Sequence, residues 1–201
     1  MGTKESGGLL PSGYTQLEYL ENALGKSAYF NTGLKTSTTF GFEVDAMFYD
    51  AINSTSTALF GGRYAANNRD VGIMSIAADS RVGELRLGGT SNKFNANLTQ
   101  NTRFTASLLN GVFTTSTNIS TNVTYGSSHN CHINVFCQGG YNNADPLNNS
   151  HGRIYSLKFY SGSELVRHYI PCIDPNNVYG MYDLVTETFK GSAASDEFTG
   201  A

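Results

Sequence analysis

Hydrophobic and polar residues alternate along much of this chain with a period of two, the pattern of half-buried β-strands. In residues 38–49 every second position is apolar, which places Phe40, Phe42, Val44, Ala46 and Phe48 on one face. Glu43 and Asp45 fall on the other face. Similar short runs recur along the chain between clusters of Gly, Asn and Ser, whereas helical periodicity is hard to find. The pattern predicts an all-β protein in which one face of the 38–49 strand is core and the other is accessible.

Two short turn sequences predict β-hairpins. Asn110-Gly111 divides two strand-like runs within residues 103–117, and both residues tolerate the positive φ angles of a tight turn. Ser161-Gly162 separates the run 154–160 from the run 165–170. Many such strands without intervening helices predict two antiparallel sheets packed face to face, as in a β-sandwich or jelly roll.

Residues 131–138 form a further predicted strand. Cys131, Ile133, Val135 and Cys137 share one face, so both cysteines are expected to pack in the core, with His132, Asn134, Phe136 and Gln138 opposite. Two Gly- and Asn-rich segments, 61–70 and 139–150, are predicted to be long loops at the edges of the sandwich, where binding residues often lie.

Composition narrows the choice of function. The 201 residues suit one domain, which we expect over 10–201. Only 14% of residues are charged and the net charge is −3, so neutral polar groups cover the surface and no cationic field attracts nucleic acid. No apolar run is long enough to insert into a membrane, and the start of the chain shows no signal peptide. Residues 1–9 are expected to be a flexible segment or a remnant of an expression vector.

Several segments carry a resemblance to a known family, and together they bracket residues 10 to 200. They are 10–21, 28–33, 151–160, 165–172, 180–185, Phe189 and 198–200. These segments resemble a concanavalin A-like, laminin-G-like family of jelly-roll domains found in phage structural proteins and bacterial surface proteins. The resemblance implies the two-sheet sandwich, places Cys172 near a strand end, and supplies no catalytic residues.

Members of that family usually serve as carbohydrate-binding or adhesion modules. The resemblance therefore implies a non-enzymatic module on a virion or a bacterial cell surface, whose partner is a surface polysaccharide or glycan. A homo-oligomer such as a trimer, or contact with other virion proteins, fits the same setting. The alternative is a structural decoration or fibre domain that makes only protein contacts, which the absence of Trp, a common stacking platform for sugars, favours.

Sugar binding needs aromatic faces for stacking, and amide or carboxylate groups that bond hydroxyls. Each of the two predicted loops offers one Tyr among amides and a carboxylate. The candidate residues are Arg63, Tyr64, Asn67, Asn68 and Asp70 in the first loop and Tyr141, Asn142, Asn143 and Asp145 in the second. Asp70 and Asp145 with their neighbouring asparagines also supply the hard oxygens that Ca²⁺ prefers, although such sequences are equally good turns. Calcium is thus a possible cofactor, and no other metal or cofactor is expected.

Glu43 and Asp45 invite comparison with laminarinase-type glycoside hydrolases, whose strand motif carries a further Glu three or four residues after the Asp. Here those positions hold Phe48 and Tyr49. Because retaining hydrolysis needs a nucleophile and a separate acid, a hydrolase is the weakest of the three hypotheses. Glu43 and Asp45 can instead be outward-facing polar residues, or can bond sugar hydroxyls on the accessible sheet face beside Tyr49.

Overall fold

The chain forms a β-sandwich without helices in the part that is described. The computed structural model describes residues 9–49, 57–65, 68–76, 81–88, 93–96, 98–140, 146 and 148–201. Every regular element in these residues is a strand. The prediction of an all-β, two-sheet antiparallel fold is confirmed.

The larger sheet has the strand order β11-β10-β9-β4-β14-β15-β16-β17, with β1 beside β15 and with β2 between β14 and β18. Its strands are β1 (Thr15–Gln16), β2 (Leu20–Asn22), β4 (Phe40–Phe48), β9 (Phe104–Leu109), β10 (Val112–Thr115), β11 (Ser120–Asn122), β14 (Gly152–Ser161), β15 (Glu164–Ile173), β16 (Tyr179–Asp183), β17 (Thr188–Gly191) and β18 (Thr199–Gly200).

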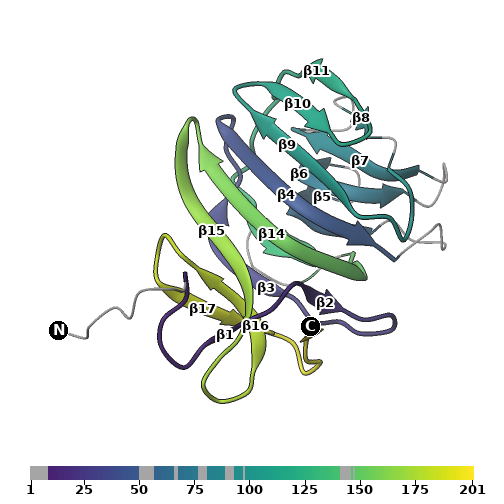
Figure 1. Cartoon of the computed structure of the whole chain (residues 1–201). Coiled ribbons are helices and arrows are strands. Elements are labelled where there is room, and N and C mark those ends of the chain that lie inside the picture. The colour runs from purple at the N-terminus through teal and green to yellow at the C-terminus, as the bar shows by residue number, and fades with distance from the viewer. Residues whose placement is uncertain are drawn as a thin grey trace.

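The smaller sheet has the order β3-β12-β5-β6-β7-β8 and lies behind the larger one in Figure 1. Its strands are β3 (Phe30–Lys35), β5 (Thr57–Ala65), β6 (Asn68–Ile76), β7 (Arg81–Leu87), β8 (Lys93–Asn95), β12 (His132–Val135) and β13 (Gln138–Gly140). β13 runs parallel to β5, which is the exception to an otherwise antiparallel arrangement of the described strands.

Aromatic rings from both sheets form the core. Phe42 of β4 and Phe159 of β14 meet Phe60 of β5, with ring centroids 5.0 and 5.3 Å apart. Phe30 of β3 and Tyr169 of β15 form a second contact between the sheets at 5.2 Å. All five side chains are buried. The alternation of 38–49 is confirmed, because each of its predicted apolar positions is buried.

Both predicted hairpins are present. Asn110 and Gly111 have φ angles of 51° and 76° at the turn between β9 and β10. Gly162, with a φ of 61°, lies in the turn between β14 and β15. The positive φ angles explain why Asn and Gly occupy these positions.

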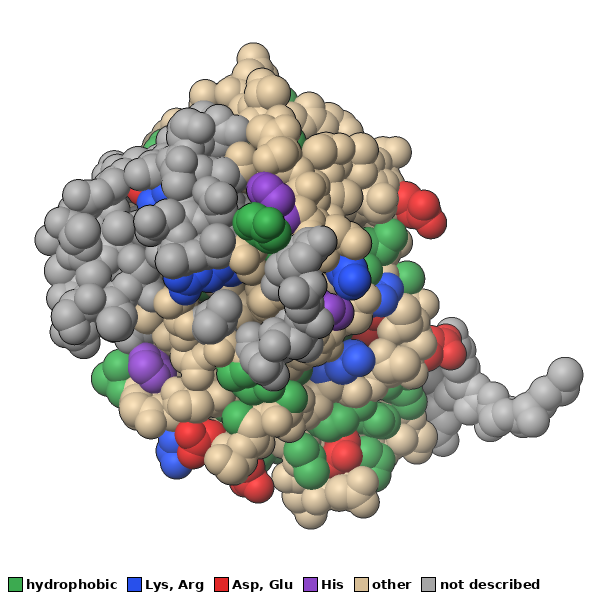
Figure 2. Space-filling model, turned by 180° about the vertical axis from the view of Figure 1, so that it is seen from behind, with side chains coloured by type: hydrophobic (Ala, Val, Ile, Leu, Met, Phe, Trp, Pro, Cys, Tyr) green, Lys and Arg blue, Asp and Glu red, His purple; other side chains and the backbone are tan. Residues whose placement is uncertain are grey.

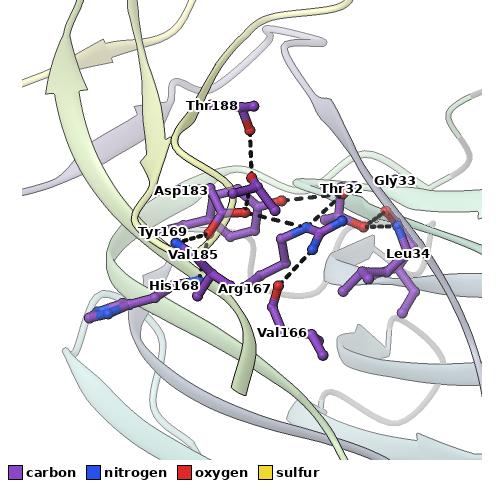
Figure 3. Close-up of polar contacts among 12 residues, drawn as sticks. Thr32, Gly33, Leu34, Val166, Arg167, His168, Tyr169, Asp183, Val185 and Thr188 are labelled. Carbon is purple, nitrogen blue, oxygen red and sulfur yellow. Dashed lines mark hydrogen bonds and ion pairs between the residues drawn. The ribbon is translucent and has the colours of Figure 1, made fainter. Parts of the chain in front are cut away.

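A buried carboxylate anchors the end of β16. Asp183 is fully buried and accepts hydrogen bonds from the backbone N–H of His168 and the hydroxyl of Thr186, at 2.9 and 2.6 Å. The Arg167 guanidinium lies 3.3 Å from Asp183 and also donates to the Thr32 carbonyl of β3 (Figure 3). Arg167 therefore links β15 and β16 of the larger sheet to β3 of the smaller sheet. The side chain of His168 points away from this cluster (Figure 3).

The prediction of a long loop over 61–70 is wrong, because most of this segment forms the adjacent strands β5 and β6. The glycines of this segment allow neighbouring strands to pack closely against it. A Cβ on Gly62 would lie 2.9 Å from the Cβ of Cys131 and from the carbonyl oxygen of His132. Glycine in a strand often marks such a close approach of backbone segments.

The predicted strand 131–138 and loop 139–150 are also corrected. β12 ends at Val135, since Phe136 has a φ of 63° and breaks the alternation. Asn134, Phe136 and Gln138, predicted on the face opposite the cysteines, are fully buried, as both cysteines are. Gly139 and Gly140 belong to β13 rather than to a loop. The burial of Cys131 and Cys137 in the core is confirmed.

The described surface is mostly neutral, and its charged side chains are scattered over the face shown in Figure 2. Cys172 is buried at the penultimate position of β15, as expected. None of the described residues belongs to a helix that is long and apolar enough to cross a membrane. Residues 1–8, most of the predicted flexible segment, lie outside the described residues.

Replacing Phe159 by Ala should lower the free energy of unfolding by about 3–5 kcal/mol, because Phe159 packs between Phe40, Phe60 and Tyr169 and its loss leaves a cavity. Urea unfolding measures the change. The exposed Val185 is the control, and Val185→Ala should change the free energy by about 0.5 kcal/mol or less. Equal effects of the two substitutions would contradict this core assignment.

Candidate functional site: the polar face of the larger sheet

A row of polar residues crosses the outer face of the larger sheet. Residues directly opposite one another in paired strands point to the same side. The strand register aligns Thr114 of β10 with Ser107 of β9, Ser107 with Glu43 of β4, Glu43 with Lys158 of β14, and Lys158 with His168 of β15. Glu43 is thus the centre of a continuous polar row over five strands, on the face that the alternation predicted to be accessible.

This row borders an open hollow of about 430 Å³. Glu43, Asp45 and Lys158 contribute its charged groups. Its remaining polar lining consists of short hydroxyl side chains: Thr105, Ser107, Thr114, Thr115, Ser116 and Ser156. Short residues leave the space above the sheet open, so the hollow is a consequence of side-chain size along β9 and β10.

A β-bulge in β14 shapes the hollow. The pairing of β14 with β4 shifts between Ile154 and Ser156. Tyr155 and Ser156 therefore both lie toward the outer side, with Ser156 in the hollow and Tyr155 beneath Arg103. Bulges commonly redirect side chains next to functional sites.

Glu43 is held in its ionised form. Its carboxylate accepts a hydrogen bond from the Tyr160 hydroxyl at 2.5 Å and one from Lys158 Nζ at 3.1 Å. The Tyr160 bond, and then Lys158, hold the pKa of Glu43 below its ordinary value, against the opposing effect of burial. Burial, followed by the bond to Glu43, raises the pKa of Tyr160 to about 12. Glu43 is therefore an acceptor at neutral pH.

His168, at the end of the row, is neutral at the same pH. Burial is the main cause that lowers its pKa, and the charge of Lys158 adds to it. Asp183 and Glu43 act in the opposite direction without reversing the shift. An uncharged imidazole can both donate and accept hydrogen bonds.

Asp45 is also paired. Its two oxygens accept from Arg103 Nε and Nη2, each at 2.8 Å. This bond is the main reason that the pKa of Arg103 is raised. The Arg103 guanidinium lies 3.7 Å above the ring of Tyr155, so a two-point ion pair and a cation–π contact hold it in place.

The aromatic and charged network continues beyond Tyr155. Tyr155 meets Tyr19 at 5.7 Å, and the guanidinium of Arg153 lies 3.9 Å above the Tyr19 ring. Glu21 accepts hydrogen bonds from Arg153 Nε at 2.7 Å and from the Tyr49 hydroxyl at 2.6 Å. Tyr49 was expected beside Glu43 and Asp45, but its hydroxyl donates its hydrogen bond to Glu21 instead.

The structure describes only part of the predicted loop site. Asn67, Tyr141, Asn142, Asn143 and Asp145 lie outside the described residues. The backbone of Asn68 and Asp70 lies in β6, and their side chains are outside the described part of the structure. The calcium hypothesis depends on these side chains and on those of the second loop, so it stays a prediction.

Arg63 and Tyr64 lie on β5 of the smaller sheet. Tyr64 is 45% exposed and its ring stacks on His129, with centroids 4.2 Å apart. The candidates that can be placed therefore occupy two sheets: Glu43 and Asp45 share the outer face of the larger sheet, and Tyr64 belongs to the smaller one.

Sequence reasoning missed the partners of Glu43 and Asp45. Lys158 and Tyr160 come from β14, 115 and 117 residues away from Glu43, and Arg103 is 58 residues from Asp45. A local signal existed, because Lys158 and Tyr160 alternate with buried Phe159. The β-bulge obscured this signal, because it interrupts the alternation of buried and exposed positions at Tyr155 and Ser156.

Within the described ranges, no three His, Cys, Asp or Glu side chains gather as a metal site would require.

Comparisons with known proteins support the fold. No family model and no curated protein sequence matches the chain. A similar fold occurs in a solved structure of a proposed carbohydrate-binding protein from Bacteroides ovatus, with a TM-score of 0.57 and 10% sequence identity. The similarity covers 92% of this chain and 60% of that protein, so the chain spans less than two thirds of its length. At this identity the likeness shows the shared β-sandwich.

Replacing Tyr160 by Phe should raise the pKa of Glu43 toward its ordinary value, because the main interaction that lowers it is lost. In the native protein, ionised Glu43 stabilises the fold above its ordinary pKa, and this contribution disappears as the pH falls through the lowered pKa. In Tyr160→Phe the contribution should be smaller and should be lost completely at a higher pH. NMR titration of the Glu43 carboxyl measures the change.

Tyr14→Phe is the matched control, because the Tyr14 ring contacts Tyr182 and Phe189 rather than Glu43. It should leave the Glu43 titration unchanged. A Glu43 titration that is also unaltered by Tyr160→Phe would show that the 2.5 Å contact does not set the charge of this carboxylate.

Proposed function

We propose that this protein is a non-enzymatic carbohydrate-binding module whose site is the hollow on the outer face of the larger sheet. The observation that carries the proposal is the combination of two cation-paired carboxylates, Glu43 and Asp45, with short hydroxyl side chains in one open hollow. A neutral sugar presents many hydroxyl groups, which donate to carboxylates and exchange hydrogen bonds with Ser and Thr. The volume lies within the usual range for small-molecule sites.

The charge pairing around the hollow suits an uncharged ligand. Lys158 accompanies Glu43 and Arg103 accompanies Asp45, so the local charges balance. A paired carboxylate is held in place and still has lone pairs that can accept hydrogen bonds from a sugar. The same pairing leads us to propose that sugar binding here needs no metal ion.

The state of the carboxylates also supports the proposal that the site is not catalytic. A glycoside hydrolase needs one carboxyl group with a raised pKa that acts as the acid. Glu43 has a lowered pKa. Asp45 accepts a two-point hydrogen bond from Arg103, so both of its oxygens already have a cationic partner.

We propose further that the ligand is a surface glycan and that the module works as an adhesion or receptor-binding domain on a virion or a bacterial cell. The resemblance of the sequence and the carbohydrate-binding description of the Bacteroides ovatus protein support this role. An open hollow of this kind binds weakly, so display in a trimer or on a particle would supply the strength of attachment.

Binding of a fluorescent, deliberately tetramerised form of the chain to bacterial cells and purified polysaccharides tests the proposal. Ser156→Trp should fill the hollow, and Glu43→Gln should weaken charge-assisted hydrogen bonds, each reducing affinity by roughly tenfold or more. Glu164→Gln is the matched control, because Glu164 is exposed at the β14–β15 hairpin and outside the hollow. Removal of divalent metals with EDTA should have no effect.

Saturable binding that one polysaccharide blocks, without release of sugar, is the expected result. Binding that survives both hollow variants would overturn the site assignment, and sugar release would overturn the non-enzymatic role. Failure to bind any polysaccharide would instead favour a structural domain that contacts proteins.

A further inference from the structure

A second hollow, of about 470 Å³, lies at one end of the sandwich and is lined by residues of both sheets. We call it the end groove. Its floor is apolar, with Phe40 and Leu108 from the larger sheet and Leu87 from the smaller one. Its rim includes the turn residues Asn110 and Gly162 of the two hairpins.

The chemistry of the end groove restricts its occupant. All the residues that line it are uncharged. A charged ligand would lose hydration there without gaining a counter-charge, which is unfavourable. The exposed threonines Thr38, Thr39 and Thr124 offer hydroxyl groups at the rim, above the apolar floor. The combination suits an uncharged ligand with a small apolar group on one side and hydrogen-bonding groups on the other.

The end groove adjoins the face hollow. Gly41 lines the groove, and Glu43 of the same strand lines the hollow two residues away, about 7 Å along β4. Gly41 pairs with Tyr160, whose hydroxyl bonds Glu43. A Cβ on Gly41 would lie 2.7 Å from the Leu108 carbonyl oxygen and 3.4 Å from the Tyr160 Cβ. Gly41 is buried, and its missing side chain lets β4 lie close against Leu108 of β9 and Tyr160 of β14 between the two sites.

We propose that the end groove is a second sugar subsite, which takes a neutral sugar unit carrying a methyl-bearing substituent, such as a 6-deoxy or N-acetyl sugar. The methyl group contacts the floor at Phe40 and Leu108, and the ring hydroxyls face Thr38, Thr39 and Thr124. The assignment of a sugar as ligand rests on the proposed function. It adds the class of sugar and a second point of contact for the same glycan.

NMR titration of the ¹⁵N-labelled chain reads the two sites separately. The backbone amides of Gly41, Gly111 and Gly162 report on the end groove, and those of Ser107 and Lys158 report on the face hollow. The probes are rhamnose, N-acetylglucosamine, glucose and glucuronic acid as free monosaccharides. Rhamnose or N-acetylglucosamine should shift the groove amides saturably in the millimolar range, and glucuronic acid should not.

Thr124→Trp blocks the groove with a large ring at an exposed rim position and should weaken the groove response by about tenfold or more. Its control, Thr15→Trp, adds the same ring to β1, on an exposed threonine outside both sites, and should leave both responses intact. The peak dispersion of the same ¹⁵N spectrum confirms that each variant is folded.

Groove amides that respond to neither methyl-bearing sugar, or respond equally to glucuronic acid, would overturn the inference. So would an unchanged groove response in folded Thr124→Trp. If Ser107 and Lys158 shift while the groove amides stay still, the proposed function survives and the groove assignment fails. If the groove amides alone respond, the groove assignment stands and the face site fails.

Discussion

The pairing of β4 with β14 is the constraint on which both the core and the candidate site depend. This one register places Phe42 beside Phe159 inside the sandwich and Glu43 beside Lys158 outside it. A shift of one residue would exchange the two faces, so that aromatic rings would meet water and charges would enter the core. The burial of Phe42 and Phe159 against Phe60 therefore selects the same register that assembles the polar face.

Each of the two carboxylates in the face hollow is paired with a cation. Glu43 is held by Tyr160 and Lys158, and Asp45 is held by Arg103 over the ring of Tyr155. This pairing fixes the positions of the carboxylate oxygens and balances their negative charge. The proposed ligand, a neutral molecule rich in hydroxyl groups, fits such a surface better than an ion does. The low fraction of charged residues in the chain is consistent with a neutral ligand.

Glycine has two different uses in this fold, and they explain why glycine-rich segments that form strands look like loops in the sequence. At Gly111 and Gly162 it allows the positive φ of hairpin turns. At Gly62 it allows β5 to lie against the segment around Cys131, so a glycine-rich stretch forms a strand. At Gly41 it likewise avoids a clash with the Leu108 carbonyl oxygen of the neighbouring strand β9. Composition alone does not distinguish these uses, because each depends on what lies opposite the glycine.

Local sequence determined the strand class, the two hairpin turns and the outward direction of Glu43 and Asp45. These properties depend on the alternation of neighbouring residues and on the φ preferences of Asn and Gly. The end of β12 at Phe136 and the burial of Asn134 and Gln138 were decided by packing between strands distant in the chain. The tertiary structure alone brought Lys158 and Tyr160 to Glu43 and Arg103 to Asp45, because strand register across 58 to 117 residues is set by the packing of the whole core.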